Sequence, residues 1–458
     1  MTLAKQNSVH THSGPTIALV DWCHLIEDFL DNLGVSFDSF QKEFRGSWIF
    51  GYIDALQAAG VKAVLFCVSA RVAAPWRFIH VPTNAPVCVL PALAVYRAIR
   101  RRIPNPYGST VEEAFGDIHG VRRPILATLK DIAAYLATPL NSFAGELRRE
   151  GCGAILCQDY EHPRFDACVL LGKLMRLPVF ATFQGGDTQY TNFERPLRPL
   201  TVRACAGLII ATQSEAQRVC SRYALPPAKV KRIFNPINVE MWRPIDRRQA
   251  RAVLGIPADA RVAVWHGRID LYRKGLDILL NAWEQVWRKR LGRDLRLLLV
   301  GTGNDAEDLR RRIADMHLEG VLWIDKFLHD CTAIRLYLSA ADVYAFPSRH
   351  EGFPVAPIEA MSCGLPVVAA NAPGITDIFE GGEVSGGLVV PPGHTVAFSL
   401  ALRRLLDNET FASELGKRAR RRADACFSLG EVGEQLRRFL FKSGAAVDRP
   451  NGGRDHSQ

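Results

Sequence analysis

The stretch PSRHEGFPVAPIEAMSCGLPVVAA, residues 347–370, decides how the rest of the chain is interpreted. It follows the apolar run Tyr344–Phe346, which predicts the end of a buried strand. Pro347 ends that strand, because proline cannot donate a ladder hydrogen bond, and Gly352 and Pro354 keep the next residues out of regular structure. The sequence therefore predicts a loop at the end of a strand.

A short helix and a second strand follow this loop. Pro354 or Pro357 suits the first turn of a helix that runs to about Ser362. Gly364 ends the helix, and Val367–Ala370 is typical of a parallel strand buried on both faces. A loop between a strand and a helix suits an anion, because free backbone N–H groups and the helix dipole point at one place.

Two carboxylates flank that place, Glu351 in the loop and Glu359 in the helix. Their oxygens suit the hydroxyl groups of a sugar around a bound phosphate. Taken alone, both residues are more simply explained as solvated surface glutamates, so the surrounding sequence has to decide.

Length and composition indicate a two-domain globular protein. The chain has 458 residues, more than one ordinary hydrophobic core, and 48% of them are hydrophobic. No apolar run is long enough to span a bilayer. Residues 1–15 are polar and lack the apolar core of a signal peptide, so a flexible lead-in is expected. Eleven cysteines without CxxC pairs predict free thiols in a reducing, cytoplasmic compartment.

The net charge of +10 suits an anionic ligand, an anionic membrane surface or nucleic acid. Nucleic acid is not expected, because no aromatic-rich basic motif is present. Each basic cluster is most simply the solvated face of a helix, and the clusters are Arg97–Arg102, Arg247–Arg251, Arg288–Arg296 and Arg418–Arg422. The first cluster also suggests peripheral contact with the inner face of a membrane.

Strands and helices alternate along the chain, which predicts doubly wound parallel sheets. In the first half, strands are predicted at 16–20, 61–68, 154–157, 178–182, 206–211 and 230–234, and helices at 46–58, 92–101, 126–136, 142–149, 165–175 and 214–223. In the second half, strands are predicted at 262–265, 295–300, 321–324, 343–346 and 367–370, and helices at 247–254, 275–287, 305–316, 331–340, 395–406, 409–426 and 430–441. Ser214 is the predicted cap of its helix.

The segment Asn235–Pro244 interrupts the alternation of strands and helices and is the predicted boundary between two domains. The predicted parts are a lead-in 1–15, domains 16–238 and 239–425, a helix 426–441 that returns to the first domain, and a disordered tail 442–458. A ligand cleft is expected between the domains, at the carboxyl ends of the strands. Gly46 and Ser47, at a helix start, are a weak phosphate signal. The irregular, proline-dotted region 70–120 is a candidate for substrate recognition.

Glycines and cations follow two strands of the second half. Gly267 and Arg268 end one strand and Lys274 precedes the next helix, so both cations can reach one anion. Gly301 and Gly303 form a turn after the next strand. Surface cations and ordinary turns explain each feature alone, but together three strand ends suit a phosphorylated ligand. A pair of cations would stabilise the charge that develops as a diphosphate leaves.

The segments WHGRIDLYRKGLDILLNAW, VGTGN and PSRHEGFPVAPIEAMSCGLPVVAA, in this order and spacing, resemble the retaining glycosyltransferases of family 4, which have the GT-B fold. The similarity is strong over about residues 230–400 and looser at GSWIFGYIDALQAAG and FATFQGGD. It implies an α/β protein with two Rossmann-like domains facing each other across a cleft. The first domain would bind the acceptor and the second the nucleotide-sugar donor.

In that family two glutamates separated by seven residues mark the donor site, as Glu351 and Glu359 are here. The resemblance implies that Glu351 contacts the donor sugar and Glu359 the ribose. It also implies that Arg268 and Lys274 hold the diphosphate. Pro354 replaces a small residue often found there and has no N–H to donate. The other implied donor-binding residues are Gly267, Gly301, Gly303, Gly352, Phe353 and Val355.

Many relatives have a histidine after the strand 178–182 where this chain has Gln184, and glutamine cannot act as a general base. A retaining front-side reaction does not strictly need one, since the leaving phosphate can take the acceptor proton. Gln184 and Asp187, with His162 beside Asp159, are candidate contacts for the sugar or the acceptor. A turn at GGD and a helix start at His162 explain them equally well. Because no Asp-x-Asp motif is present, neither a metal nor another cofactor is expected.

These features predict a hexosyltransferase of glycan biosynthesis that retains anomeric configuration. Its partners would be a nucleotide-diphosphate sugar and a glycan, lipid-linked or small-molecule acceptor. Two alternatives stay open. One is another GT-B enzyme: an epimerase would turn over a nucleotide sugar without any acceptor, and a phosphorylase would need free phosphate. The other is a non-catalytic nucleotide-sugar-binding protein, which would tolerate loss of Glu351.

Overall fold

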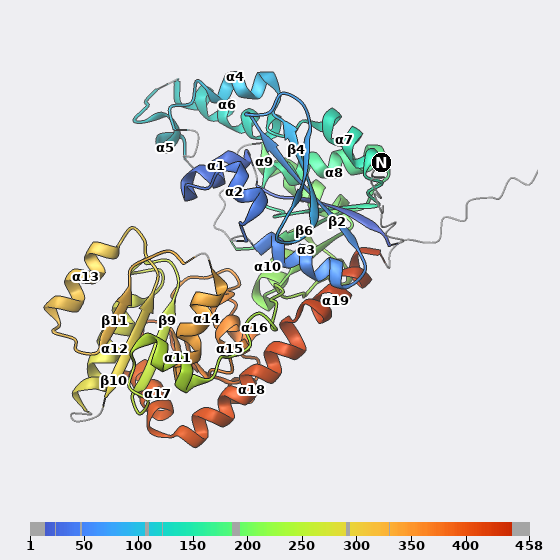
Figure 1. Ribbon diagram of the computed structural model, residues 1–458. Coiled ribbons are helices and arrows are strands. Elements are labelled where there is room, and N and C mark those ends of the chain that lie inside the picture. The colour runs from blue at the N-terminus through green and yellow to red at the C-terminus, as the bar shows by residue number, and fades with distance from the viewer. Residues whose placement is uncertain are drawn as a thin grey trace, which may run out of the picture.

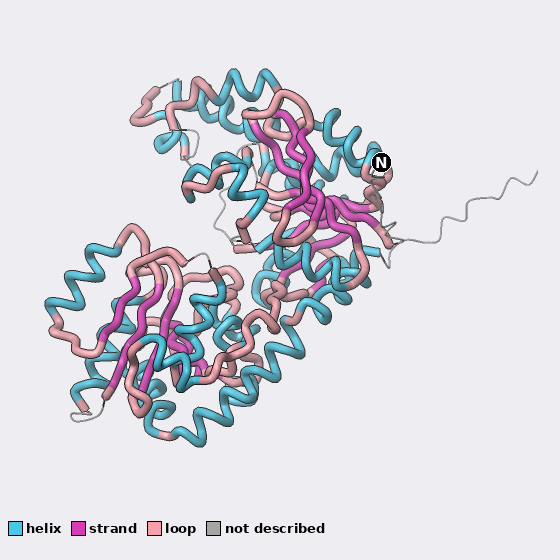
Figure 2. The backbone as a smooth tube through the Cα atoms, in the orientation of Figure 1, coloured by secondary structure: helices cyan, strands magenta, loops and turns pink. Residues whose placement is uncertain are grey.

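A computed structural model describes residues 14–22, 24–45, 48–105, 110–120, 122–185, 193–289, 294–328 and 330–441. These residues form two α/β domains, one above the other in Figure 1, each built on its own sheet (Figure 2). This arrangement confirms the predicted doubly wound architecture.

The N-terminal sheet has eight strands in the order β3-β4-β2-β1-β5-β6-β7-β8. All neighbours pair in parallel except β3 and β4, which form an antiparallel hairpin at one edge. The strands are β1 Thr16–Val20, β2 Lys62–Ser69, β3 Trp76–His80, β4 Ala85–Pro91, β5 Ala154–Cys157, β6 Val179–Phe183, β7 Gly207–Ile210 and β8 Val230–Lys231.

Helices cover both faces of this sheet. One face packs against α1 Ile26–Leu30, α2 Phe37–Lys42, α3 Trp48–Ala58 and α19 Leu429–Phe441. The other packs against α4 Ala94–Arg100, α6 Arg122–Leu136, α7 Leu140–Arg149, α8 Pro163–Met175, α9 Glu194–Ala204 and α10 Gln213–Tyr223. A short helix, α5 Val111–Phe115, lies beside α6.

The C-terminal sheet has six parallel strands in the order β11-β10-β9-β12-β13-β14. They are β9 Arg261–His266, β10 Leu295–Val300, β11 Val321–Ile324, β12 Val343–Phe346, β13 Val367–Ala370 and β14 Gly387–Val390. One face packs against α11 Arg247–Leu254, α14 Cys331–Ala340, α15 Ala356–Ser362, α16 Ile375–Ile378 and α18 Glu409–Phe427. The other packs against α12 Leu276–Arg288, α13 Ala306–Asp315 and α17 Thr395–Asp407.

The chain passes between the domains at two places that touch each other. Ile237, after β8, donates its backbone N–H to the Phe427 carbonyl at 2.8 Å and forms a bridge with Ser428. Beyond Ser428, α19 lies along α3 of the N-terminal domain and buries Val432 and Leu436 there.

Several local predictions for the first half are wrong. The region 70–120 is not irregular throughout, because Trp76–His80 and Ala85–Pro91 form the edge hairpin, turned at Asn84 with φ +53°. Three helices of this half are absent from the prediction: α1 and α2, both before Arg45, and α9. Thr212, not Ser214, is the residue at the start of α10.

Two arginine clusters are also not simple solvated faces. Arg251 is only 4% exposed and pairs with Asp342 at 2.8 Å. Arg420 and Arg422 donate to backbone carbonyls of the neighbouring helices, at Ser362 and Ile378. These side chains therefore brace the C-terminal domain. The cysteine prediction is confirmed for the ten cysteines that the structure describes, all of which are free thiols.

Candidate functional site

The loops after β9, β10 and β12 pack backbone against backbone at the carboxyl edge of the C-terminal sheet. A Cβ atom on Gly301 would lie 1.9 Å from the Gly267 carbonyl oxygen. A Cβ atom on Gly303 would lie 2.1 Å from the carbonyl oxygen of Ile269. Gly275, with φ +64°, likewise lies against the Pro347 carbonyl oxygen. Only glycine permits these approaches, so the turns predicted from the sequence meet in one cluster.

Lys274 and Glu351 form an ion pair across this cluster, with Nζ 2.7 Å from Oε1. Glu351 is largely buried, and it holds Lys274, the cation that the resemblance assigns to the diphosphate, in an ion pair that was not predicted from the sequence. Arg268 is exposed and has no ion-pair partner among the described residues. The loops therefore present one paired and one unpaired cation on the same side of the sheet.

Glu359 is held by a residue that sequence reasoning did not assign. His266, the last residue of β9, lies with Nε2 2.8 Å from the Glu359 carboxylate. The Tyr344 hydroxyl donates a hydrogen bond to the backbone carbonyl of His266 at 3.4 Å, which helps to fix the position of this histidine. Burial raises the pKa of Tyr344 well above its ordinary value, so the phenol stays neutral. The strand-end position of His266 was the available signal.

The loop between β12 and α15 carries free donors. Among the described residues, the backbone N–H groups of Gly352, Phe353 and Val355 have no hydrogen-bond acceptor. Phe353 is fixed by stacking on Phe234, with ring centroids 5.3 Å apart. Pro354 separates these donors and adds none of its own. Such a row of N–H groups suits anionic or hydroxyl oxygens.

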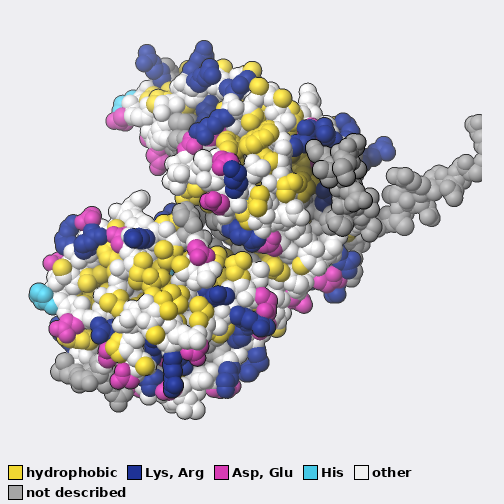
Figure 3. All heavy atoms as spheres, in the orientation of Figure 1, with side chains coloured by type: hydrophobic (Ala, Val, Ile, Leu, Met, Phe, Trp, Pro, Cys, Tyr) yellow, Lys and Arg dark blue, Asp and Glu magenta, His cyan; other side chains and the backbone are white. Residues whose placement is uncertain are grey.

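The loop between β12 and α15 also packs closely against the N-terminal domain. A Cβ atom on Gly352 would lie 2.4 Å from the Gln184 carbonyl oxygen and 2.8 Å from the Gly185 Cα atom. Gln184 and Gly185 follow β6 of the N-terminal domain. The carboxyl edges of both sheets therefore face each other, and Figure 3 shows a hollow between the two domains.

Gln184 is engaged with the interdomain segment. Its Oε1 accepts from the Asn235 amide at 2.9 Å, and the Tyr52 hydroxyl donates to Asn235 Oδ1 at 3.2 Å. The candidate contact with a sugar or acceptor thus lies at the cleft but already has a protein partner. The sequence analysis predicted Asn235 to lie at the domain boundary but assigned no contact to its side chain.

Acidic residues after β5 form the other part of the N-terminal side. Asp159 accepts from the backbone N–H groups of Glu161 at 2.8 Å and Gln184 at 3.4 Å. Burial raises the pKa of Asp159 to about 7, and burial with the nearby Asp159 charge raises the pKa of Glu161 to about 7. Burial lowers the pKa of His162 to about 4, so this imidazole is neutral at pH 7.

Three predicted site residues lie outside the described residues: Gly46, Ser47 and Asp187. A further group not predicted from the sequence is Asp21, directly after β1. Its Oδ2 atom is buried without a hydrogen-bond partner among the described residues, and burial raises its pKa to about 7. Asp21, Asp159 and Gln184 follow β1, β5 and β6, which are neighbouring strands.

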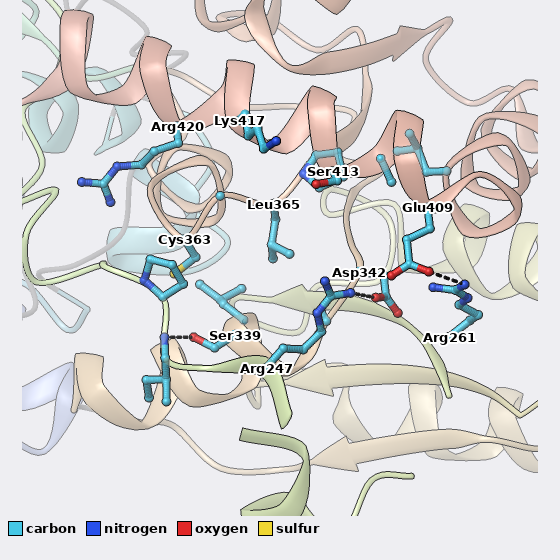
Figure 4. A pocket seen from close by; sticks show the side chains of 18 of the residues that line it. Arg247, Arg261, Ser339, Asp342, Cys363, Leu365, Glu409, Ser413, Lys417 and Arg420 are labelled. Atoms are coloured by element: carbon cyan, nitrogen blue, oxygen red, sulfur yellow. Dashed lines mark hydrogen bonds and ion pairs between the residues drawn. The ribbon is translucent and has the colours of Figure 1, made fainter. Parts of the chain in front are cut away.

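A cavity of the C-terminal domain lies away from these strand ends. It has a volume of about 530 Å³ and opens at the amino edge of the C-terminal sheet, between α11, α14 and α18 (Figure 4). Arg247 pairs there with Asp342, and Arg261 pairs with Glu409 at 2.9 Å. Because its charges are largely paired with each other and it is remote from the strand ends, we do not assign the site to it. No helix among the described residues is long and apolar enough to cross a membrane.

Two facing Rossmann-like domains with this loop cluster between them define the GT-B class. Residues 260–408 match the family model described as Glycosyl transferases group 1, which confirms the resemblance to glycosyltransferases over these residues. This match includes the glycine turns, both cations and both glutamates.

Curated relatives include the D-inositol 3-phosphate glycosyltransferases of Kineococcus radiotolerans and Saccharomonospora viridis. The first is 32% identical over 247 residues, 51% of this chain and 56% of the relative. The second is 35% identical over 250 residues, 53% of this chain and 57% of the relative. The chain thus matches about half the length of these relatives.

Solved structures share the fold over nearly the whole chain. Sucrose-phosphate synthase from Thermosynechococcus elongatus has a TM-score of 0.64 at 21% identity, covering 94% of this chain and 100% of that one. HepE from Anabaena, solved in complex with UDP, has a TM-score of 0.65 at 16% identity, covering 93% and 99%.

Proposed function

We propose that this protein is a retaining glycosyltransferase that moves a sugar from a nucleotide-diphosphate donor to an acceptor in the interdomain cleft. The observation that carries the proposal is the Lys274–Glu351 ion pair. It lies among glycine turns at three strand ends, and Gly352, next to Glu351, packs against Gln184 and Gly185 of the other domain. The curated relatives are named as glycosyltransferases, and HepE has also been solved with UDP-glucose, which supports a nucleotide-sugar donor.

In this proposal the diphosphate is bound by Arg268, Lys274 and the N–H groups of Gly352, Phe353 and Val355. As the bond between the anomeric carbon and the phosphate oxygen breaks, negative charge develops on the diphosphate, and the two cations stabilise it. Because the ion pair with Glu351 fixes Lys274 before the reaction, little reorganisation of this cation is needed. No protein-bound metal or other cofactor is required by this scheme.

Glu351 is assigned to the donor sugar and Glu359 to the ribose. The acceptor oxygen forms its bond to the anomeric carbon on the face from which the diphosphate departs. Its proton passes to the leaving diphosphate oxygen, so anomeric configuration is retained and a nucleoside diphosphate is released. His266 keeps the Glu359 carboxylate in place, since their atoms are 2.8 Å apart.

The acceptor would enter from the N-terminal side, near Asp21, Asp159 and Gln184. Buried carboxylates with raised pKa values can donate as well as accept hydrogen bonds near pH 7, which suits a polyhydroxylated acceptor. We place the protein in the cytoplasm, because its described cysteines are free thiols.

The test measures nucleotide release and product configuration with a panel of UDP-, GDP-, ADP- and dTDP-sugars, chosen by the thermal shift each produces. Lys274→Ala, Arg268→Ala and Glu351→Gln are each expected to lower kcat by about 10² to 10³, as for removal of one transition-state contact. Lys417→Ala, at the remote cavity, is the matched control and should be unaffected.

Undiminished transfer in all three variants would show that the site is wrongly assigned. An inverted product anomer would overturn the retaining reaction while leaving the donor site intact. Donor turnover that is independent of any acceptor would favour the epimerase.

A further inference from the structure

Four helices on the outer face of the N-terminal domain expose an unusual number of apolar side chains. α4 contacts α6, α6 contacts α8, and α8 contacts α9. Leu174 on α8 is 75% exposed, Ile125 on α6 65% and Leu200 on α9 61%. The apolar side chains exposed on these helices are Val95, Ile125, Ile132, Leu170, Leu174, Leu197 and Leu200. We call this surface the α4–α9 face.

A groove lies within the α4–α9 face, between α6 and α9. Its volume is about 480 Å³, and apolar or aromatic side chains line it, including Ile132, Leu136, Phe193 and Leu197. Exposing such a surface to water is unfavourable, because apolar side chains are more stable when they are removed from water. Contiguous apolar surface of this kind marks an interaction site.

The exposed charges on the same four helices have one sign. Their carboxylates are Asp131, Asp166 and Glu194, and each is at most 7% exposed. The exposed charged side chains on the face and at its helix ends are basic, and those with no ion-pair partner among the described residues are Arg101, Arg102, Arg122, Lys173, Arg176 and Arg195. Figure 3 shows Lys and Arg side chains along the top of this domain.

Exposed apolar side chains together with basic side chains indicate which kind of partner binds the α4–α9 face. A second copy of the chain, docked face to face, would bring like charges together at each rim, which is unfavourable. An anionic bilayer accepts both parts, because its headgroups attract the arginines and lysines and its acyl region receives the leucines. Exposed carboxylates that would oppose this lie on the neighbouring α5, where Glu112 already pairs with Arg123.

We propose that the α4–α9 face docks on the surface of an anionic lipid bilayer. The proposal does not depend on the catalytic assignment. The docked face adjoins the cleft: Arg164 of α8 donates to the carbonyl of Ala137, at the end of α6, and to that of Asp21, after β1. The helices of this face and the acceptor side of the cleft are thus joined by one buried side chain.

The test is co-sedimentation of the full chain with vesicles of phosphatidylglycerol and phosphatidylcholine at a 1:1 ratio, compared with pure phosphatidylcholine, in 50 and 500 mM salt. The wild type should sediment with the anionic vesicles and lose most binding at high salt. The double variant Leu174→Ser/Leu200→Ser should weaken partitioning on the order of tenfold or more. Arg122→Ser/Arg195→Ser should weaken it about fivefold per residue.

Matched controls are Leu400→Ser on α17, which is 54% exposed, and Arg248→Ser on α11 of the C-terminal domain. Both should bind like the wild type, and circular dichroism should be unchanged in every variant. Absence of wild-type binding to anionic vesicles overturns the proposal, as does equal binding of the face variants. A wild-type dimer that Leu200→Ser dissociates, without vesicle binding, would assign the face to a second copy instead.

Discussion

The C-terminal domain packs its loops backbone against backbone around the Lys274–Glu351 ion pair, whereas the N-terminal domain lines its side of the cleft with buried carboxyl groups. On the C-terminal side, three glycine turns pack carbonyl against Cα and leave N–H groups free around Gly352. On the N-terminal side, Asp21, Asp159 and Glu161 are buried and shifted toward neutrality. A backbone-built surface is rigid and suits one constant group such as a diphosphate. A surface built from titratable side chains changes with sequence and pH, which suits a variable acceptor.

The largest expected effect tests the rigid side. Gly275→Ala must accommodate both φ +64° and a Cβ atom 2.1 Å from the Pro347 carbonyl oxygen. Left-handed strain and overpacking together should cost about 3–4 kcal/mol and abolish donor binding. Thermal unfolding and nucleotide thermal shift measure the two effects.

Gly255→Ala is the matched control for that variant. Gly255 has φ +66° in the same domain but nothing within 4 Å of its Cβ position. It should therefore lose only the conformational part, about 1 kcal/mol. Equal destabilisation by both variants would mean that the backbone contact between the loops does not matter.

Gly352→Ala tests whether the two sides must touch. The added methyl group meets Gln184 and Gly185 of the other domain, so the domains can relieve the clash by separating. We expect transfer to fall about 10²-fold, since misplaced reactants lose orientation, with a nearly unchanged melting temperature. Gly145→Ala, on a helix with open space around its Cβ position, is the control. A stability loss without a rate loss would contradict this account.

The buried carboxyl groups of the N-terminal side should make the stability of the protein depend on pH. Burial raises the pKa of Asp159 to about 7, so between pH 4 and 7 the folded state binds more protons than the unfolded state and stability falls as pH rises. Asp159→Asn removes this penalty. Relative to wild type it should gain on the order of 2 kcal/mol on going from pH 5 to pH 8. Melting temperatures across that range measure it, with the exposed Asp259→Asn as control; parallel curves for wild type and Asp159→Asn would refute the assignment.

The smallest expected effect concerns the ribose contact. Glu359→Gln keeps the size of the side chain but weakens its bond to His266, which lies 2.8 Å away. The KM for the donor should rise about tenfold with little change in kcat, as expected for loss of uniform binding. Steady-state kinetics with saturating acceptor check this. A fall in kcat at unchanged KM would move Glu359 from binding to chemistry.

The secondary structure of the C-terminal domain was predicted more accurately from the sequence than that of the N-terminal domain. In the C-terminal domain, the bounds of β10, β11, β12, β13 and α14 coincide with those expected, because short loops and apolar runs define them locally. The N-terminal hairpin was missed because its outer strand, Trp76–His80, has mostly exposed side chains and therefore lacks the apolar run of a buried strand.

The site was predictable where glycine and charge fall at strand ends, as at Gly301 and Lys274. It was not predictable where a partner lies far away in sequence. Gln184 and Asn235 are paired although they lie 51 positions apart in the sequence, and Lys274 and Glu351 although they lie 77 positions apart. Only the folded topology brings such residues together.

The two adjacent passages of the chain between the domains have a mechanical consequence. Because Ile237 and Ser428 are bridged, the connections act as a single hinge, and α19 anchors one end of it on α3. Two tethers side by side permit opening and closing about their common axis but resist twisting of one domain against the other. We therefore expect the loops around Gly352 and Gly185 to separate when a substrate enters and to return to the same register afterwards.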